Sequence, residues 1–237
     1  GHANDMDVAS FDGYSHLFVV TMTKGSNAVV RLKRSGTDLT KVASYSLRYN
    51  GSSISCSGIA IKSNSDGVIT LILKSGTTVY TGSVSASATS ATIDLSLLCT
   101  IEKSKVYLKD QFYDLSDFTN QGMGYHNGVM YVPITGTGSQ INRSVIMVFN
   151  IDGIVPGSNI YPSEAIGFRI TSSSYSALFE IESCGICSDD GRLYFNTNRG
   201  KTSSDKNHDG ISWFKDYTYV KLTEPINYQN FVVQFDA

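Results

Sequence analysis

Four short segments of the chain share one pattern, a small or polar residue, then Gly or Asp, then Met or Ile. Each segment is followed by Asp-Gly or Asn-Gly, which are preferred in two-residue β-hairpin turns because both turn positions need positive φ. The segments are Asn4–Met6, Ser57–Ile59, Gln121–Met123 and Cys184–Ile186, and the turns are Asp12-Gly13, Asp66-Gly67, Asn127-Gly128 and Asp190-Gly191. The chain therefore repeats a unit that contains a hairpin.

Three apolar, β-rich runs follow the shared segment in each copy, and clusters of Gly, Ser, Asn and Asp separate them. The second runs are His16–Thr21, Val68–Leu73, Val129–Ile134 and Arg192–Asn196. The third runs are Ala28–Leu32, Thr78–Val84, Val145–Ile151 and Ile211–Phe214. The fourth runs, which are less regular, are Leu39–Leu47, Ala91–Leu97, Ala165–Ile170 and Tyr219–Leu222. The predicted unit is a four-stranded antiparallel meander.

A single four-stranded sheet cannot bury both of its faces, whereas copies stacked radially bury them and leave short, protected edges. The chain is therefore predicted to be all-β, one small β-propeller domain over residues 1–237 with blades that start near residues 1, 55, 119 and 181. Cys99–Phe118 and Thr202–Asp209 interrupt the period and are expected on loops. The alternative is a β-sandwich whose hairpins merely resemble one another.

Charge and hydropathy exclude several classes of protein. The formal net charge is −2, and the cluster of Arg31, Lys33 and Arg34 fits the solvated face of a strand, so no nucleic-acid partner is expected. No apolar stretch is long enough to span a bilayer. No signal peptide heads the chain, so any export signal is expected outside this fragment.

The repeats resemble those of secreted proteins of Gram-positive bacteria, a group that includes helveticin-J-like proteins and modules of glycan-degrading or cell-surface assemblies. The resemblance rests on Gly1–Met6, Ser57–Ala60 and Asn120–Met123, and on the strands Asn127–Val132 and Val145–Phe149. It implies a secreted or extracellular module of a larger protein. In the resembling proteins the first segment follows an earlier repeat, so either a blade precedes residue 1 or Asn227–Phe235 helps to close the ring. Five blades are expected.

The first strand of each propeller blade lines the central channel, so polar residues of the shared segments are expected to converge. They are His2, Asn4, Asp5, Ser57, Asn120, Gln121 and Glu182. They could satisfy one another around a wet channel, because unpaired buried polar groups are costly, or they could bind a ligand. Asp5, Glu180 and Glu182 could also supply the acid and base of a glycoside hydrolase. No Gly-x-Ser-x-Gly elbow or HExxH motif is present.

Exposed aromatic side chains are the other candidate site, because sugars stack their apolar faces on Trp and Tyr. Trp213 and Phe214 are adjacent on a predicted strand, so one should face the core and the other should not. Trp213, Tyr217 and Tyr125 form the predicted sugar platform, although each could instead pack in the core or between blades.

Metal and thiol chemistry have weaker signals. Cys184 and Cys187 have CxxC spacing but no second pair, so both are predicted to be buried thiols, with a disulfide or reactive thiol as the alternative. The loop Ser204–Gly210 is rich in oxygen ligands but lacks an EF-hand pattern, so calcium is possible there and no other cofactor is expected.

The sequence thus predicts a non-catalytic module that binds a plant-wall or bacterial-wall polysaccharide or a cell-surface glycan. A helveticin-like antibacterial protein that acts at target cell surfaces and a glycoside hydrolase that uses channel carboxylates are the alternatives.

Overall fold

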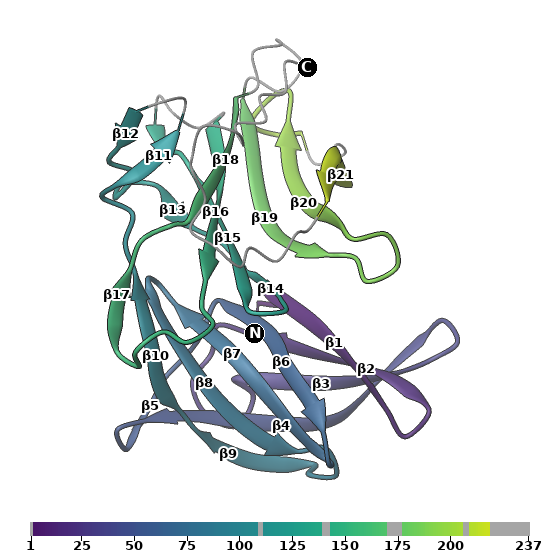
Figure 1. Cartoon of the computed structure of the whole chain (residues 1–237). Coiled ribbons are helices and arrows are strands. Elements are labelled where there is room, and N and C mark those ends of the chain that lie inside the picture. Colours follow the sequence, from purple (N-terminus) through teal and green to yellow (C-terminus); the bar gives the residue numbers. More distant parts are fainter. Residues whose placement is uncertain (1, 109–110, 139–142, 170–176, 206–208, 219–237) are drawn as a thin grey trace. The chain divides into compact units, whose positions relative to one another are not determined.

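The computed structural model describes residues 2–108, 111–138, 143–169, 177–205 and 209–218 (Figure 1). Every regular element among these residues is a β-strand, which confirms the all-β prediction. The chain forms two compact units. Unit 1 comprises residues 1–100 and 154–158, and unit 2 comprises residues 101–153 and 159–237.

Unit 1 contains two sheets. In blade 1, the strands follow the order β1-β2-β3-β4-β5, and β9 pairs with β4 in parallel. The bounds are β1 Asp5–Phe11, β2 Tyr14–Val20, β3 Val29–Ser35, β4 Asp38–Tyr49, β5 Ser52–Ser53 and β9 Ser90–Asp94. In blade 2, the order is β17-β10-β8-β7-β6. The bounds are β6 Gly58–Ser65, β7 Val68–Ser75, β8 Thr78–Ser85, β10 Ser96–Ile101 and β17 Ser158–Ile160.

The predicted fourth strand of the second copy, Ala91–Leu97, is wrong as a single strand. Its first part forms β9, which lies beside β4 of blade 1, and its end opens β10, which pairs with β8. The chain changes sheets at Leu95, whose side chain is buried and whose N–H donates to the Arg48 carbonyl. A parallel pairing with a strand more than 40 residues away leaves no local signal in the sequence.

Unit 2 contains two further sheets and a hairpin. In blade 3, the order is β13-β15-β16-β18, with β14 also on β15. In blade 4, the order is β19-β20-β21, and β11 pairs with β12 in a separate hairpin. The bounds are β11 Val106–Leu108, β12 Gln111–Tyr113, β13 Thr119–Asn120, β14 Gly124–His126, β15 Val129–Thr135, β16 Arg143–Asn150, β18 Glu164–Arg169, β19 Leu178–Ile186, β20 Arg192–Gly200 and β21 Gly210–Thr218.

Blades 1 to 4 begin at residues 5, 58, 119 and 178, close to the predicted starts. Five blades are not supported, because the described residues form four sheets of three or more strands. The predicted strands Tyr219–Leu222 and Asn227–Phe235 lie outside the described residues.

Three of the four predicted hairpin turns are confirmed. Asp12-Gly13, Asp66-Gly67 and Asn127-Gly128 have positive φ at both positions and join directly paired strands. The prediction for Asp190-Gly191 is wrong, because only Gly191 has positive φ and the connection is longer. Its ends are tied by Cys187 N–H to the Arg192 carbonyl at 3.0 Å and by Gly191 N–H to the Cys187 carbonyl at 2.9 Å.

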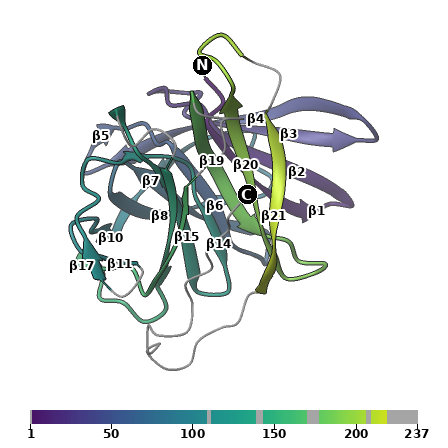
Figure 2. The same cartoon turned by 90° about the horizontal axis from the view of Figure 1, so that it is seen from above.

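Each unit has its own apolar core, built from alternate residues of its strands. In unit 1, buried side chains such as Phe18, Tyr45 and Ile59 come from both blades. In unit 2, Tyr131 and Ile146 of blade 3 belong to one cluster with Phe179, Leu193 and Phe214 of blade 4. The arrangement of β19, β20 and β21 is visible in Figure 2.

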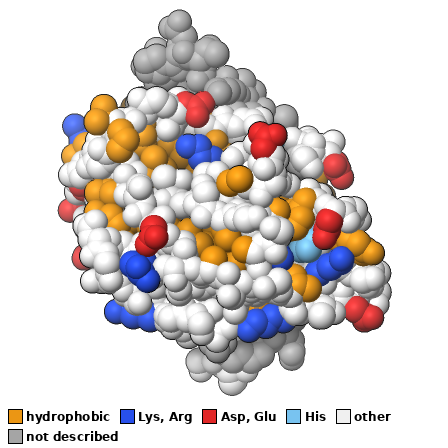
Figure 3. Space-filling view, turned by 90° about the horizontal axis from the view of Figure 1, so that it is seen from below, with side chains coloured by type: hydrophobic (Ala, Val, Ile, Leu, Met, Phe, Trp, Pro, Cys, Tyr) orange, Lys and Arg blue, Asp and Glu red, His pale blue; other side chains and the backbone are white. Residues whose placement is uncertain are grey.

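Figure 3 shows one face of the molecule, on which basic and acidic side chains are interspersed and hydrophobic side chains form separate groups. Within the described ranges, no helix is long and apolar enough to cross a membrane.

Candidate functional site

The first strands of blades 1 and 2 are joined by side chains that bond to the neighbouring backbone. Asn4 Nδ2 donates to the Ser57 carbonyl at 2.6 Å, and Asp5 Oδ2 accepts from the Ile59 N–H at 3.0 Å. One step further along, Asp7 Oδ2 accepts from the Ile61 N–H at 2.6 Å. Three of the residues predicted to converge thus lie at this joint: Asn4 bonds to Ser57, and Asp5 bonds to the nearby Ile59 backbone.

His2 lies before β1 and is exposed, so it does not take part in these hydrogen bonds. Asp5 is only 5% exposed. Burial raises the pKa of Asp7, although the backbone N–H groups of Ile61 and Val8 oppose that shift. Asp5 and Asp7 therefore stabilise the contact between β1 and β6.

Blades 3 and 4 are joined differently. Gln121 Nε2 donates to Glu180 Oε1 at 2.6 Å, and the Gly122 N–H donates to the Glu182 carbonyl at 2.7 Å. Gly124 lies so close to the Cys184 carbonyl that an added Cβ would be 2.2 Å from its oxygen. Asn120 is half-buried, and its Oδ1 has no hydrogen-bond partner among the described residues.

Glu182 occupies a β-bulge. Ile181 pairs with Thr197 and Ser183 pairs with Asn196, so Glu182 is the extra residue of β19. Bulges of this kind redirect a side chain and are frequent near functional sites. Here the bulge accompanies an interaction of the Glu182 carboxyl group with Glu180 that raises the pKa of Glu182. The sequence named both carboxylates as candidates but does not predict the bulge.

The pKa of Glu182 is raised to about 7, first by burial, then by the charge of Glu180 and the hydrogen bond to it. Asn198 acts in the opposite direction through a side-chain hydrogen bond, and the charge of Asp209 adds to the rise. Asn198 Nδ2 also lies 3.4 Å from Glu180 Oε2. Gln121 and Asn198 thus donate to the two oxygens of the Glu180 side chain. Burial and the neighbouring Glu180 therefore favour the protonated form of Glu182 up to about neutral pH.

Trp213 of β21 is half-exposed at 50%, whereas Phe214 beside it is buried, as the adjacent pair predicted. Trp213 lies directly across from Tyr194 of β20, and their ring centroids are 5.7 Å apart at an interplanar angle of 31°. Ile211, two residues before Trp213, is 74% exposed. We call Trp213 and Tyr194 the aromatic platform.

Polar groups border the aromatic platform. Tyr194 donates its hydroxyl to Asp190 Oδ2 at 3.0 Å, and Arg192 Nε lies 4.0 Å from the same oxygen. Hydrogen bonds from the Arg192 N–H and from Tyr194 lower the pKa of Asp190, so it is ionised at neutral pH. Asn196 is exposed across from Ile211.

The structure places the three residues of the predicted platform in different surroundings. Trp213 is exposed as expected, and Tyr125 is half-buried in β14 of the other blade. The backbone of Tyr217 belongs to β21, but its side chain lies outside the described set. Tyr194, the observed ring partner of Trp213, was missed because its position depends on the β20–β21 register, which shifts between Arg192 and Tyr194.

The four cysteines are free thiols. Cys56, Cys99 and Cys184 are buried and Cys187 is half-buried, so no disulfide joins Cys184 to Cys187. Burial raises the pKa of Cys56 to about 12 and that of Cys99 to about 11, which keeps both thiols protonated. They act as small apolar side chains.

Residues 206–208 of the calcium candidate loop lie outside the described residues. The flanking Asp205 and Asp209 carboxylates accept from the backbone N–H groups of Lys201 and Arg199 at 2.9 and 3.1 Å. In the part of the chain that the structure describes, no group of three or more His, Cys, Asp or Glu side chains could hold a metal ion.

No protein-family model and no curated protein matches the chain. Among solved structures, it is similar to the RS223 β-xylosidase at 11% identity and a TM-score of 0.41, covering 81% of this chain and 63% of that one. It is also similar to the GH43_1 enzyme from Xanthomonas citri complexed with xylose, at 11% identity and a TM-score of 0.43. That match covers 87% of this chain and 66% of the enzyme. The chain thus spans less than two thirds of either structure.

Proposed function

We propose that the chain is a non-catalytic carbohydrate-binding module and that the aromatic platform is its sugar-binding surface. The observation that carries the proposal is the half-exposed Trp213 set across from Tyr194, with their rings 5.7 Å apart. Sugar rings present apolar C–H faces that stack on such side chains. Because both rings lie on paired strands, the surface is held rigid before a ligand arrives.

The polar border supplies the hydrogen bonds that orient a sugar. Asp190 is an ionised acceptor, Arg192 is a donor, and Asn196 can do both. A few polar groups around an apolar surface are typical of small-molecule sites that discriminate among hydroxyl patterns.

The carboxyl pair argues for binding over hydrolysis. Glycoside hydrolases hold their two catalytic carboxyl groups about 5–9.5 Å apart so that the scissile bond or a water fits between them. Both oxygens of the Glu180 carboxyl group instead accept from protein side chains, Oε1 from Gln121 and Oε2 from Asn198. Gln121 belongs to blade 3 and Asn198 lies across from Glu180 on β20, so these bonds fix Glu180 within unit 2.

The proposed partner is a plant-wall or bacterial-wall polysaccharide or a cell-surface glycan. The proposed setting is a secreted or extracellular protein, of which this chain is one module. Both follow from the resemblance of the repeats to helveticin-J-like and related secreted proteins of Gram-positive bacteria.

The test is a glycan-array screen followed by titration of the best ligand into the wild type and Trp213→Ala. We expect Trp213→Ala to weaken binding at least about tenfold, since the stacking surface is lost. Phe112→Ala is the control, because Phe112 is also an exposed aromatic residue of unit 2, at 59%, but lies on the hairpin β11–β12. Equal affinities for wild type and Trp213→Ala, or no binding to any glycan, would overturn the proposal.

A hydrolase remains the second candidate because Glu182, with a pKa of about 7, could donate a proton at neutral pH. Release of reducing sugar by the wild type but not by Glu182→Gln would favour it. A helveticin-like antibacterial protein would instead reduce the viability of Gram-positive target cells, which neither a binding module nor a hydrolase requires.

A further inference from the structure

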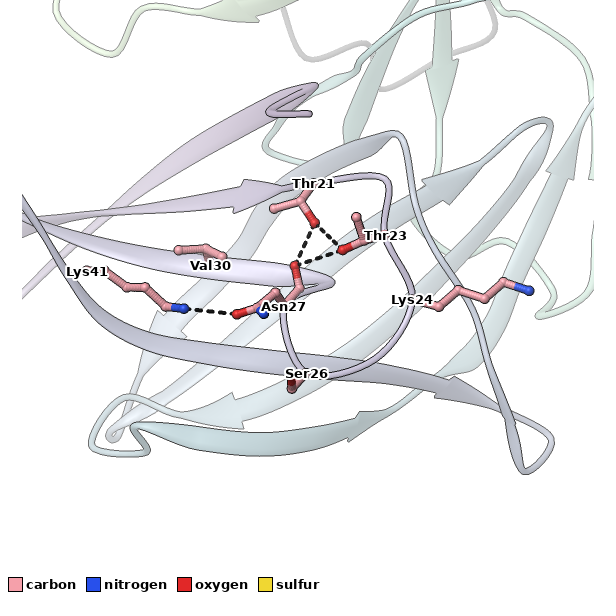
Figure 4. A pocket seen from close by; sticks show the side chains of 7 residues that line it. All are labelled: Thr21, Thr23, Lys24, Ser26, Asn27, Val30 and Lys41. Atoms are coloured by element: carbon pink, nitrogen blue, oxygen red, sulfur yellow. Dashed lines mark hydrogen bonds between the residues drawn. The ribbon is translucent and has the colours of Figure 1, made fainter. Parts of the chain in front are cut away.

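A hollow of about 420 Å³ lies in unit 1 at the connection between β2 and β3 (Figure 4). Its wall is made by residues of this connection, by Val30 of β3 and by Lys41 of β4. The polar lining distinguishes it from the aromatic platform, which belongs to unit 2.

The connection is held in one conformation by its own hydrogen bonds. Thr21 Oγ1 donates to the Asn27 carbonyl at 2.6 Å, and the hydroxyls of Thr21 and Thr23 lie 2.7 Å apart. Backbone bonds from Thr21 N–H to the Ala28 carbonyl and from Ala28 N–H to the Gly25 carbonyl close the loop. These hydrogen bonds of the threonine hydroxyls hold the backbone of Asn27 in place.

Lys41 sets the orientation of the Asn27 amide. Its ammonium donates to Asn27 Oδ1 at 2.9 Å, and an ammonium can only donate, so the amide oxygen must face Lys41. The amide nitrogen of Asn27 therefore presents its two N–H groups elsewhere. Lys41 keeps two more N–H groups, since one of three is used. The Ser26 hydroxyl adds another donor to the same lining.

The charge of the lining is positive. Lys41 is directed towards Asn27, and Lys24 projects on the far side of the loop (Figure 4). The residues that line the hollow include no carboxylate. Among the described residues, neither Lys24 nor Lys41 forms an ion pair. The hollow is thus lined by N–H and O–H donors and two lysines, without a carboxylate. Such a lining favours the binding of an oxyanion.

We propose that this hollow binds an oxyanion group, a carboxylate or a sulfate, carried by an acidic polysaccharide. The Lys41 ammonium and the Asn27 amide N–H groups contact the oxyanion, and Lys24 adds attraction at longer range. The identity of the ligand as a polysaccharide rests on the proposed function, whereas the affinity of the hollow for an oxyanion does not. The inference names acidic sugars as a preferred class of ligand.

The experiment follows the Asn27 side-chain amide signals by NMR while the full chain is titrated with sodium sulfate, with oligogalacturonate and with neutral xylo-oligosaccharide. We expect sulfate and oligogalacturonate, but not the neutral sugar, to shift these signals. Lys41→Met should weaken the effect of oligogalacturonate about tenfold, as expected for loss of one charged hydrogen bond. Lys62→Met is the matched control, because Lys62 is an exposed lysine of β6 in the same unit.

The outcomes separate the two proposals. Oligogalacturonate binding that depends on Trp213 but leaves the Asn27 signals unmoved would overturn the inference while the proposed function stands. Sulfate-induced shifts that Lys41→Met removes, without binding of any glycan, would support the oxyanion site and overturn the proposed function. If Lys41→Met and Lys62→Met weakened the effect of oligogalacturonate equally, general surface charge would explain the binding, and the inference would be overturned.

Discussion

In each unit, contacts join the first strands of two neighbouring blades, but the contacts differ between the units. In unit 1, side chains bridge the joint, and Asp5 and Asp7 each accept a backbone N–H of β6. In unit 2, backbones meet directly, with Gly122 N–H on the Glu182 carbonyl and Gly124 against Cys184. Carboxyl groups therefore bind neighbouring backbone in the unit 1 joint, whereas in the unit 2 joint Glu180 accepts from the Gln121 side chain beside the direct backbone contacts.

This difference predicts which change each joint tolerates. A joint made by side chains should fail when a side chain is removed, and a joint made by backbone contact should fail when a side chain is added. It also predicts that Glu182 of the unit 2 joint makes stability depend on pH near neutrality. Four substitutions test these expectations.

Gly124→Ala should have the largest effect. The new Cβ would lie 2.2 Å from the Cys184 carbonyl oxygen and 3.0 Å from the Gly185 Cα, and neither backbone atom can rotate away. We expect a loss of about 3 kcal/mol or more in the free energy of unfolding, measured by urea denaturation. Gly185→Ala is the control, because nothing lies within 4 Å of its added Cβ. Equal stability of the two variants would contradict direct backbone contact in this joint.

Asp5→Ala should come next, at about 2–3 kcal/mol by the same measurement. The substitution leaves the Ile59 N–H without its side-chain acceptor in a site where Asp5 is only 5% exposed. Asp5→Asn keeps an acceptor oxygen and should recover part of the loss. Asp38→Ala, at an exposed position of β4, should change stability by less than about 0.5 kcal/mol. A loss in Asp38→Ala as large as in Asp5→Ala would disprove the role of the bridge.

Glu182→Gln should remove a pH dependence. The pKa of Glu182 rises from its ordinary 4.5 to about 7 on folding, so between these pH values the folded state holds a proton that the unfolded state releases. Stability therefore decreases as pH rises through this window, by about 1–2 kcal/mol once solvent screening is allowed for. Glu182→Gln stays neutral, so we expect a flat profile and higher stability than wild type at pH 8.

The measurement is the free energy of unfolding in urea between pH 5 and pH 8. Glu102→Gln is the control, because Glu102 is also a half-buried glutamate of unit 2. A slope in Glu182→Gln as steep as in the wild type would show that another group carries the pH dependence.

The sequence predicted the strands well where turn chemistry was strong. The strand starts at Val68 and Val129 agree with the structure because Asp-Gly and Asn-Gly supply the positive φ of a two-residue turn. Asp190-Gly191 failed because the Asp190 side chain instead accepts the Arg192 N–H at 3.0 Å in a longer loop. Asp-Gly or Asn-Gly thus forms a two-residue hairpin turn in this chain where the strands on either side pair up to the dipeptide itself.

The candidate sites were predictable in residue type but not in partnership. The shared segments correctly placed Asn4, Asp5 and Ser57 together, since all lie at the start of a first strand. The partners Asn198 of the carboxyl pair and Tyr194 of Trp213 were missed, because two bulges shift the registers that bring them there. Bulges depend on long-range pairing, which a single sequence does not reveal.

The smallest expected effect compares two asparagines of the unit 1 joint. Asn4 Nδ2 donates to the Ser57 carbonyl at 2.6 Å in a half-buried place, and Asn64 Nδ2 donates to the Ser10 carbonyl at 2.8 Å in an exposed one. Asn4→Ala should cost about 1 kcal/mol of unfolding free energy, and Asn64→Ala about half as much, because water replaces the lost donor at the exposed end. A larger loss for Asn64→Ala than for Asn4→Ala would contradict this prediction. It would show that the exposed hydrogen bond stabilises the unit 1 joint more than the half-buried one does, so burial would not explain the strength of these side-chain bonds.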